Sequence, residues 1–554
     1  MLAFISSIGL AVAVAVIARY FYIFTEPTIS RGDQQPRVQL DQGTFVGTRN
    51  ENIDKFLGIP YAKPPVGDLR FRLPVANEPY KGTHNASTFG SSCLQQAISF
   101  SSPANLAPEA IELLKSFSVP LPKSDEDCLT LNIWKPSEVP EGTRLPVVVW
   151  IHGGGFEVGS AASTDGSVIV KRSLEMDNPI MYISINYRLS AFGFLAGTEV
   201  KNAGVANLGL QDQREALRWV QRYISAFNGD PSKVTIWGQS AGAWSVGLQM
   251  VANAGDNEGL FRGAFMHSGS PVPYGDISHG QKYYDELVVE AGCANASDSL
   301  QCLRGVSSSV IKTMMDATPS LLSKEALSIV WMPRSDGTFF VDPPFQAVLK
   351  GAVANVPFVS GECDDEGTLF MLAQSDIITD NEVQEFVSSN YFPNASADEM
   401  NRLLTMYPQD LSQGSPFATG NRNALTPQSK RLAALQGDLL YTAPRRFLLQ
   451  QRSEKQPAWS FSSRRMKSFP DLGSFHAHDM ANVYGPGDLT DYLVNFVNYL
   501  DPNGPDSADW PQYTPSGRVL MTFLDGPAPR KLERDDFRED SIGYVTSLLL
   551  KYAL

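Results

Sequence analysis

Short apolar runs alternate with longer segments of helical spacing through most of the chain. Five such runs predict buried strands: residues 146–151, 180–185, 234–237, 264–266 and 356–360. Between two of them, residues 210–227 have the spacing of an amphipathic helix. Near-continuous apolar strands that alternate with helices predict an α/β fold, in which a central, mostly parallel sheet is covered by helices on both faces.

No repeat, low-complexity segment or Pro/Gly-rich linker divides the chain. We therefore expect one large domain from residue 35 to residue 554. Within it, residues 380–455 have mostly helical character, and we expect them to form an insertion on the cap side of the sheet.

The N-terminal residues 1–24 have the pattern of a signal peptide or a signal anchor. Residues 1–18 carry no charged side chain, and the apolar run from residue 8 continues to residue 24 with Arg19 as its one break. If the segment is an uncleaved anchor, Arg19 on its C-terminal flank favours a cytosolic body. Cleavage is the favoured outcome, with a membrane-anchored protein as the alternative.

Three glycosylation sequons argue for export. Asn85, Asn295 and Asn394 each begin an Asn-Ala-Ser triplet. Because three sequons stand beside a hydrophobic N-terminus, we expect a secretory route, an extracellular location and glycans on these three residues.

The overall composition excludes several classes of function. The chain has 554 residues, 43% of them hydrophobic and 19% charged, which is ordinary for a globular protein. The net charge is −14, and no basic run or basic-aromatic stripe occurs, so nucleic acid is not an expected partner. No CxxC pair and no histidines with zinc spacing occur, so neither a metal site nor another cofactor is predicted.

The most informative residue is Ser240, at the centre of Gly238-Gln239-Ser240-Ala241-Gly242. A predicted strand precedes this pentapeptide and a helical segment follows it. This context is that of the nucleophile elbow of α/β-hydrolases, in which a sharp turn holds a serine hydroxyl above the sheet. The flanking glycines are needed because side chains would collide in so tight a turn. Ser240 is therefore the candidate nucleophile.

A serine nucleophile needs a base and an acid that orients the base. The chain has six histidines, and the order nucleophile, acid, histidine leaves His476 and His478 as candidate bases. The acid should lie on a loop after a strand between nucleophile and base, and residues 361–367 form such a loop after the predicted strand 356–360. Chemistry alone does not choose among its four carboxylates, which belong to Glu362, Asp364, Asp365 and Glu366.

The sequence also predicts donors for an oxyanion. His152-Gly153-Gly154-Gly155-Phe156 follows a buried strand, as in the glycine loop of esterases. Glycines let backbone N–H groups approach one small anion, and the residue after the nucleophile, Ala241, supplies a further N–H.

The ordered motifs of this chain resemble those of the type-B carboxylesterase/lipase family, which includes cholinesterases and large fungal lipases. The matching segments are FLGIPYA at 56–62, PPVG at 64–67, LRF at 69–71, EDCLTLNI at 126–133, NYR at 186–188, GLQDQ at 209–213 and the segment 228–242. The resemblance runs from about residue 38 to the C-terminal region. It implies the α/β-hydrolase fold with cap or lid insertions.

The resemblance also implies roles for individual residues. The family's Asp-Glu-Gly pattern falls on residues 365–367 and makes Glu366 the acid. Its His-x-x-Asp/Glu pattern makes His476 the base rather than His478. The oxyanion donors map to Gly154, Gly155 and Ala241.

The family's disulfides map to Cys93–Cys128 and Cys293–Cys302, which leaves Cys363 unpaired. An oxidising compartment would permit both bonds.

Two ion pairs and one departure complete the resemblance. Arg188 with Asp212, and Arg70 with Glu126, match structural ion pairs of the family. The departure is Gln239, where many members carry Glu. It removes a negative charge beside the nucleophile and makes a cationic, choline-like substrate less favoured.

The implied function is hydrolysis of carboxylic esters through a Ser-His-Glu triad and an acyl-enzyme, with a small-molecule or lipid ester as the substrate. The Cys93–Cys128 loop corresponds to the lid of the family's lipases, and a helical apolar stripe lies within it: Ala107, Ala110, Ile111, Leu114 and Phe117. Such a helix can bind a lipid interface and permit lipase activity on long acyl chains, or it can pack on the body. The alternatives from other classes are a non-catalytic adhesion or binding homologue and a serine amidase.

Overall fold

The computed structural model describes residues 35–98, 103–117, 123–485, 487–505 and 507–554, with the side chains of residues 116 and 117 left aside. The predicted targeting segment 1–24 lies outside these ranges. None of the helices described is both long and apolar enough to cross a bilayer.

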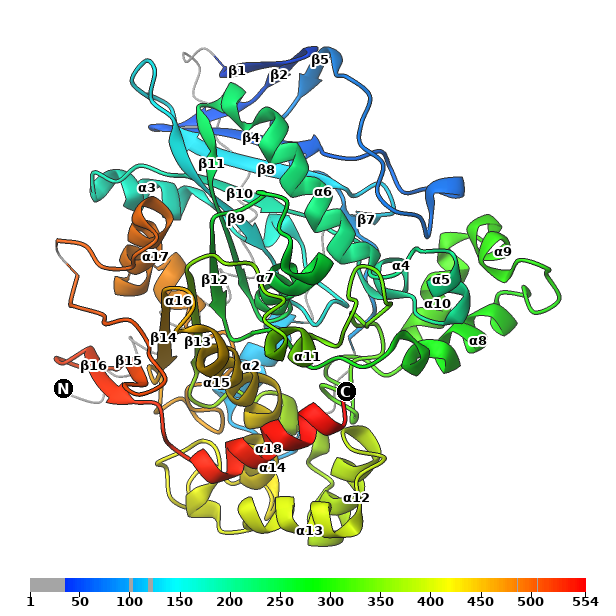
Figure 1. The fold of residues 1–554 in the computed structure, drawn as a ribbon, viewed down its shortest axis with the longest axis vertical. Helices are drawn as coiled ribbons and strands as arrows, with labels where there is room; N and C mark the ends of the chain where they lie inside the picture. The colour runs from blue at the N-terminus through cyan, green and yellow to red at the C-terminus, as the bar shows by residue number, and fades with distance from the viewer. Residues whose placement is uncertain (1–34, 99–102, 118–122, 486, 506) are drawn as a thin grey trace.

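A large mixed sheet forms the centre of the molecule (Figure 1). From edge to edge its strands are β16 (Arg530–Arg534), β15 (Val519–Phe523), β14 (Ala458–Ser463), β13 (Phe358–Cys363), β12 (Gly263–His267), β11 (Gly229–Gln239), β9 (Leu145–Ile151), β10 (Met181–Ile185), β8 (Thr130–Pro136), β4 (Ile53–Pro60) and β3 (Thr48–Asn50). Neighbours from β15 to β10 run parallel, whereas β16 at one edge and β8, β4 and β3 at the other pair antiparallel. The predicted mostly parallel sheet is confirmed.

Helices cover both faces of this sheet (Figure 1). One face carries α3 (Ser167–Glu175), α16 (Met480–Tyr484) and α17 (Asp488–Tyr499), and the other carries α6 (Leu208–Tyr223), α7 (Ala241–Val251), α11 (Pro344–Leu349) and α15 (Ala443–Arg452). Strand β9 shows why two layers are needed. Val147, Val149 and Ile151 belong to the apolar cluster of the second group of helices, and Val148 and Trp150 belong to that of the first.

All five predicted strands are present, but the boundaries of one matter for the site. The strand predicted at 356–360 is β13, which begins at Phe358 and continues to Cys363. Gly361, Glu362 and Cys363 therefore lie in a strand and not in the predicted loop. The reason is that β14 pairs with β13 along its whole length, up to Cys363 opposite Ser463. The helix predicted at 210–227 is α6 followed by a 3₁₀ turn at Ile224–Phe227.

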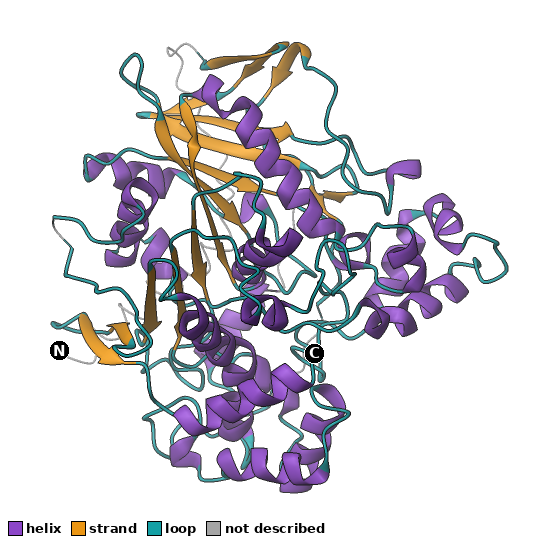
Figure 2. Ribbon diagram, in the orientation of Figure 1, coloured by secondary structure: helices purple, strands orange, loops and turns teal. Residues whose placement is uncertain are grey.

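Residues 380–455 are mostly helical, as predicted. They contain α12 (Asp380–Asn390), α13 (Ala397–Met406), α14 (Ser429–Gly437), a π-helical turn at Asp438–Thr442 and α15. Helices α12 to α14 gather beside α18 (Glu539–Lys551) at one end of the molecule (Figures 1 and 2). Helices α12 and α13 both begin with a capping box, which satisfies otherwise free N–H groups.

Smaller elements surround the sheet. Strands β1 (Arg37–Leu40), β2 (Gln42–Val46) and β5 (Lys81–Asn85) form a separate three-stranded sheet, and β6 (Ser92–Cys93) pairs with β7 (Ser124–Asp125). Another helical group contains α4 (Ser190–Phe194), α5 (Thr198–Asn202), α8 (Gln281–Glu290), α9 (Ser299–Gly305) and α10 (Ser308–Asp316) (Figure 1). Helix α2 (Pro108–Phe117) lies in the segment between β6 and β7.

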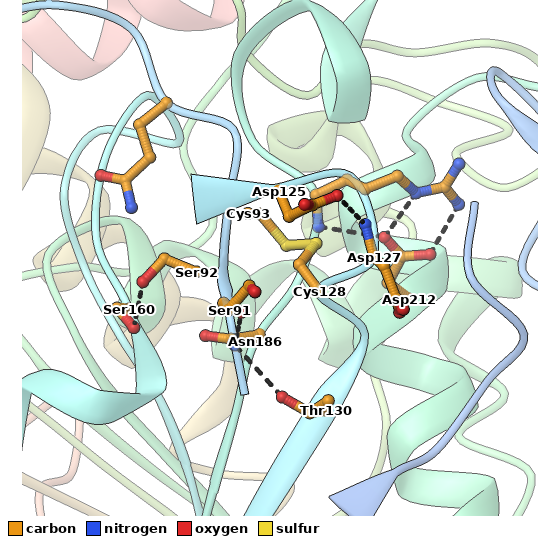
Figure 3. The surroundings of a disulfide bond; sticks show 12 residues. Ser91, Ser92, Cys93, Asp125, Asp127, Cys128, Thr130, Ser160, Asn186 and Asp212 are labelled. Atoms are coloured by element: carbon orange, nitrogen blue, oxygen red, sulfur yellow. Dashed lines mark hydrogen bonds and ion pairs between the residues drawn. A yellow bond between two sulfur atoms is a disulfide. The ribbon is translucent and has the colours of Figure 1, made fainter. Parts of the chain in front are cut away.

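The structure contains both expected disulfides, Cys93–Cys128 and Cys293–Cys302, and Cys363 is a buried free thiol. Figure 3 shows the first bond at the base of the segment that carries α2. Asn186 next to it donates to the Ser91 carbonyl oxygen at 3.0 Å. The bond therefore closes a 35-residue segment whose base is fixed to the sheet.

A buried ion pair joins the end of β10 to helix α6. The Arg188 guanidinium donates to both carboxylate oxygens of Asp212, at 2.7 and 2.6 Å, and Asp212 also accepts the Arg188 backbone N–H at 3.0 Å. Both side chains are at most 4% exposed. The second expected pair, Arg70–Glu126, is likewise bidentate, at 2.5 and 2.6 Å.

We expect Asp212→Asn to lower the free energy of unfolding by about 3–5 kcal/mol, because it leaves a buried guanidinium without its counter-charge. Lys115→Ala is the matched control. The Lys115–Glu112 pair is more than 60% exposed on both sides and should contribute less than about 1 kcal/mol. Urea unfolding of the three proteins measures the difference, and equal losses from the two substitutions would contradict the assignment.

Candidate active site

Ser240 sits in a sharp turn between β11 and α7. Its backbone angles are φ 57° and ψ −128°, a conformation that L-residues adopt at a cost of about 1–3 kcal/mol. The Ser240 N–H donates to the His267 carbonyl oxygen at 2.9 Å, and the Ser240 carbonyl accepts the Trp244 N–H at 2.8 Å. Strand β12 and the first turn of α7 thus hold the elbow in its strained form.

The flanking glycines are required by crowding. A Cβ atom on Gly238 would lie 2.3 Å from the carbonyl oxygen of Gly242, and a Cβ on Gly242 would lie 2.0 Å from that of Ile151. A methyl group on Gly238 would force the turn open, and one on Gly242 would push it away from β9. The predicted elbow therefore has the geometry expected from its pentapeptide.

The structure brings His476 and Glu366 into direct contact. The His476 Nδ1 atom lies 2.5 Å from Glu366 Oε2, and both side chains are buried, with 6% and 2% of their surface exposed. The second carboxylate oxygen of Glu366 accepts the Cys363 backbone N–H at 2.6 Å. The acid is therefore fixed at both oxygens, one on the imidazole and one on the end of β13.

The other three carboxylates of this region bind cations instead. Glu362 pairs with Arg445 at 3.0 Å, and burial raises its pKa to about 7. Asp364 pairs with Arg464 at 3.2 Å and with Lys467. Asp365 pairs with Lys467 at 2.6 Å. Of the four candidates that the sequence left open, Glu366 is the one that contacts a candidate base.

The second candidate histidine is engaged elsewhere. Nε2 of His478 lies 2.9 Å from the Ser463 hydroxyl, and its Nδ1 lies 2.7 Å from the Phe475 carbonyl oxygen. Burial lowers the pKa of His478 and favours its neutral form. These contacts make His478 part of the packing against β14.

The other ring nitrogen of His476 contacts an unexpected residue. The side-chain amide nitrogen of Gln239 lies 3.1 Å from His476 Nε2. The Ser240 hydroxyl, in contrast, makes no hydrogen bond with any side chain or backbone group in the described parts of the chain. The structure thus places Ser240, His476 and Glu366 in one region, but the Ser240–His476 hydrogen bond is not formed in this conformation.

Three free N–H groups lie in the predicted oxyanion loop and at the elbow. Gly154 and Gly155 have φ of 108° and 64°, and a Cβ atom on Gly154 would lie 2.2 Å from the Val158 carbonyl oxygen. Within the described residues, the N–H groups of Gly154, Gly155 and Ala241 donate to no acceptor. Free donors of this kind suit an anion that forms during a reaction.

Two buried titratable groups flank the oxyanion loop, and both are neutral near pH 7. Burial lowers the pKa of His152 to about 4, and its ring stacks on Tyr187 at 4.5 Å. Burial raises the pKa of Glu157 to about 8, and its carboxyl accepts the Leu321 N–H at 2.6 Å. Sequence reasoning missed Glu157, although its place directly after the glycine loop was a usable signal.

Aromatic rings form a wall next to the base. The centroids of Tyr441 and Phe370 lie 4.9 and 5.2 Å from that of His476, and Trp244 stacks on Tyr441 at 5.7 Å. Tyr441 belongs to the π-helical turn before α15, a feature that often marks functional sites. This turn was not predicted, because residues 380–455 were expected only to be mostly helical, without boundaries for individual helices.

Helix α2 packs on the body in this structure. Ala110, Leu113 and Leu114 are buried, whereas Ile111 is partly exposed. The predicted stripe therefore omitted Leu113, and the side chain of its last member, Phe117, lies outside the described residues. The N–H of Ala107, just before the helix, donates to a carboxylate oxygen of Asp471 at 2.7 Å, five residues before His476.

The three sequon asparagines, Asn85, Asn295 and Asn394, are exposed. A glycan on any of them would extend into solvent without displacing the core.

Comparisons with known proteins identify the family of this chain. A sequence model described as the carboxylesterase family matches residues 34–538. Lipase 4 of Diutina rugosa is 40% identical over 508 residues, which cover 88% of this chain and 91% of that lipase. A secreted triacylglycerol lipase of Gibberella zeae is 38% identical over 541 residues, covering 94% and 92%.

Among solved structures, EstA of Aspergillus niger superimposes with a TM-score of 0.79 and 27% identity, and the match covers 94% of this chain and 99% of that one. The family model and the lipase relatives span nearly the whole chain, and EstA shares its fold. The chain therefore belongs to the carboxylesterase family, and it is a carboxylic ester hydrolase with the α/β-hydrolase fold.

Proposed function

We propose that this hydrolase acts through an acyl-enzyme on Ser240, with His476 as the general base and Glu366 as the acid that orients it. One observation carries the proposal: the buried Glu366–His476 pair lies beside a strained serine elbow and three free N–H donors. The same set of groups favours a catalyst over the alternative of a binding homologue, which would need none of these strained or unpaired features.

The steps follow from the geometry. His476 Nε2 takes the proton of the Ser240 hydroxyl as the oxygen attacks the ester carbonyl carbon. Glu366 stabilises the imidazolium that results, and the N–H groups of the oxyanion loop and of Ala241 bind the tetrahedral oxyanion. When the intermediate collapses, His476 returns the proton to the departing alcohol. Water, activated by His476 in the same way, then releases the carboxylic acid and restores Ser240.

We further propose a secreted lipase that acts on long-chain acyl esters. The name of the Gibberella zeae relative specifies secretion and triacylglycerol. In this chain, the apolar N-terminal pattern and the exposed Asn85, Asn295 and Asn394 support the secretory route. The buried apolar face of α2 supports contact with lipid, since a helix that leaves the body would present Ala110, Leu113 and Leu114 to an interface.

Ser240→Ala and His476→Ala should each lower kcat on a soluble ester by about 10⁵- to 10⁶-fold, because members of a triad act as a unit. His478→Ala should cost far less activity, since its ring nitrogens bind Ser463 and Phe475. Initial rates on p-nitrophenyl butyrate, with melting temperatures to confirm folding, test the assignment. A greater loss of activity from His478→Ala than from His476→Ala would overturn the choice of base.

Glu366→Gln should lower kcat by about 10⁴-fold, because it removes the charge that stabilises the imidazolium. Asp365→Asn is the matched control. Asp365 accepts from Lys467 and from the Ser474 N–H but does not contact His476. Its loss should therefore lower the melting temperature more clearly than the rate. The same rate assay decides, and a larger loss of kcat from Asp365→Asn than from Glu366→Gln would move the acid to Asp365.

Replacing Ile111 and Leu114 by Ser should weaken the action of the enzyme on an emulsion. Each lost side chain removes about 1.5–3 kcal/mol of apolar burial at the lipid surface. Lys115→Ser, on the exposed side of the same helix, is the control. The measurement is the ratio of rates on emulsified long-chain triglyceride and dissolved short-chain ester. A fall on the emulsion alone supports a lipase, whereas equal falls on both substrates would show that α2 is structural packing.

A further inference from the structure

The side chain of Gln239 lies between the base and the oxyanion loop. Its amide nitrogen is 3.1 Å from His476 Nε2, and a Cβ atom on Gly153 would lie 3.0 Å from its amide oxygen. Gln239 is the last residue of β11, and only 4% of its surface is exposed. The carboxamide is therefore enclosed next to the glycine loop, and its amide nitrogen points at the ring nitrogen that would deprotonate Ser240.

The direction of this hydrogen bond follows from the partner of the other ring nitrogen. Nδ1 of His476 faces Glu366 at 2.5 Å, and an ionised carboxylate only accepts, so Nδ1 carries the proton of the neutral ring. Nε2 of the neutral ring is then an acceptor. The Gln239 amide group donates to it, and it occupies the same lone pair that a general base uses.

We propose that Gln239 is a positioning residue that holds the lone pair of His476 in the resting enzyme and thereby stabilises the neutral base. The inference rests on the proposed role of His476 as the base. Catalysis then requires an exchange of partners at Nε2, from the Gln239 amide to the Ser240 hydroxyl. In this structure Nε2 contacts the Gln239 amide, and the Ser240 hydroxyl accordingly has no hydrogen-bond partner among the described residues.

The chemistry of residue 239 sets the balance between the two forms of His476. An amide N–H donates to Nε2 of the neutral ring. When the ring is protonated, Nε2 carries its own N–H, and two donors then face each other, which disfavours the protonated form. A leucine of similar size does neither. A glutamate only accepts, so it would bind the protonated ring and oppose the neutral one.

The other groups around His476 are the same residues in the wild type and in every variant of residue 239. Glu366 is the charged group in direct contact, and the rings of Phe370 and Tyr441 cover the imidazole. Three further sets of charges lie behind these groups: Asp479 with His267, Asp365 with Lys467, and Glu362 with Arg445. Each is paired through its own contacts, so a difference between the wild type and Gln239→Leu reports the hydrogen bond at Nε2. In Gln239→Glu, the attraction of a new negative charge adds to the change of hydrogen bond.

The first test is the pH dependence of kcat/KM on p-nitrophenyl butyrate for the wild type, Gln239→Leu and Gln239→Glu. A base works only when neutral, so the rate falls as pH decreases through the midpoint of its titration. Removing a donor to the neutral ring should raise this midpoint by about 0.4–1 pH unit in Gln239→Leu, the shift that one hydrogen bond produces. Gln239→Glu should raise it further. Gln456→Leu, which removes a buried amide that contacts no residue of the triad, should leave the midpoint unchanged.

The second test reads His476 without catalysis. In a Ser240→Ala background, ¹⁵N-histidine NMR follows the titration of Nε2, with His476→Ala to assign the signal. Adding Gln239→Leu should raise the titration midpoint and move the Nε2 shift of the neutral ring in the direction expected for a lost donor. If Gln239→Leu fails to fold, the same titration of Gln239→Glu is compared with that of the Ser240→Ala parent, and the reverse holds if Gln239→Glu fails.

The outcomes separate the two proposals. If Ser240→Ala still hydrolyses the ester at the wild-type rate, the proposed function fails. If Ser240→Ala is inactive but both Gln239 variants keep the wild-type midpoint in kinetics and in NMR, Gln239 has only a packing role and the inference is overturned. A midpoint that falls in Gln239→Leu would overturn it as well.

Discussion

The hydrogen bond between Glu366 and His476 is the constraint on which the rest of the site depends. The two residues are 110 positions apart in sequence and lie on different loops, so the fold must deliver both loops to one point. Asp365, next to the acid, does much of this. Its carboxylate accepts from Ser474 on the histidine loop at 2.8 Å and from the Phe417 N–H at 2.8 Å, and a backbone bridge joins it to Phe475. Asp365, which the sequence left open as an alternative acid, instead ties the histidine loop to the loop of the acid.

The nucleophile depends on a different kind of constraint, which is steric. Gly238, Gly242 and Gly154 each place backbone where a single added carbon would lie about 2 Å from a carbonyl oxygen. The contact at Gly242 brings the elbow directly against β9, and those at Gly238 and Gly154 keep the elbow and the oxyanion loop compact. The strain at Ser240 persists because β12 and α7 hold the residue through its N–H and its carbonyl. Side-chain hydrogen bonding therefore fixes the base, whereas close backbone packing together with two backbone hydrogen bonds fixes the nucleophile.

The sequence predicted what depends on local pattern and residue order, and it missed what depends on contacts across the fold. The apolar runs identified the central strands, since strands buried on both faces must be apolar throughout. The elbow and the glycine loop were visible because tight turns demand glycine. The end of β13 was not predicted correctly, because its last residues adopt the strand conformation by pairing with β14, which is distant in sequence. The Gln239–His476 contact joins positions 237 apart, and no local signal at Gln239 specifies it. Leu113 was missed because the predicted stripe included only positions spaced from Ala107, whereas the body also buries Leu113, which lies next to Leu114 on the helix.

The distribution of charge around the site has its own logic. On one side of the imidazole stands a single carboxylate, Glu366, placed to stabilise positive charge on His476. On the other side, where an oxyanion forms, the buried groups are neutral: burial removes the proton of His152 and keeps that of Glu157. A charged Glu157 would repel the oxyanion, and a charged His152 would add a fixed positive charge that is present before the oxyanion forms. Because both side chains are neutral, the backbone N–H groups are the donors that stabilise the oxyanion in the transition state. Gln239 stands where these two sides meet, and its neutral amide adds no charge to either. Glu366 is thus the one charge in direct contact with the base, and the charges behind it are paired with one another, an arrangement suited to neutral ester substrates.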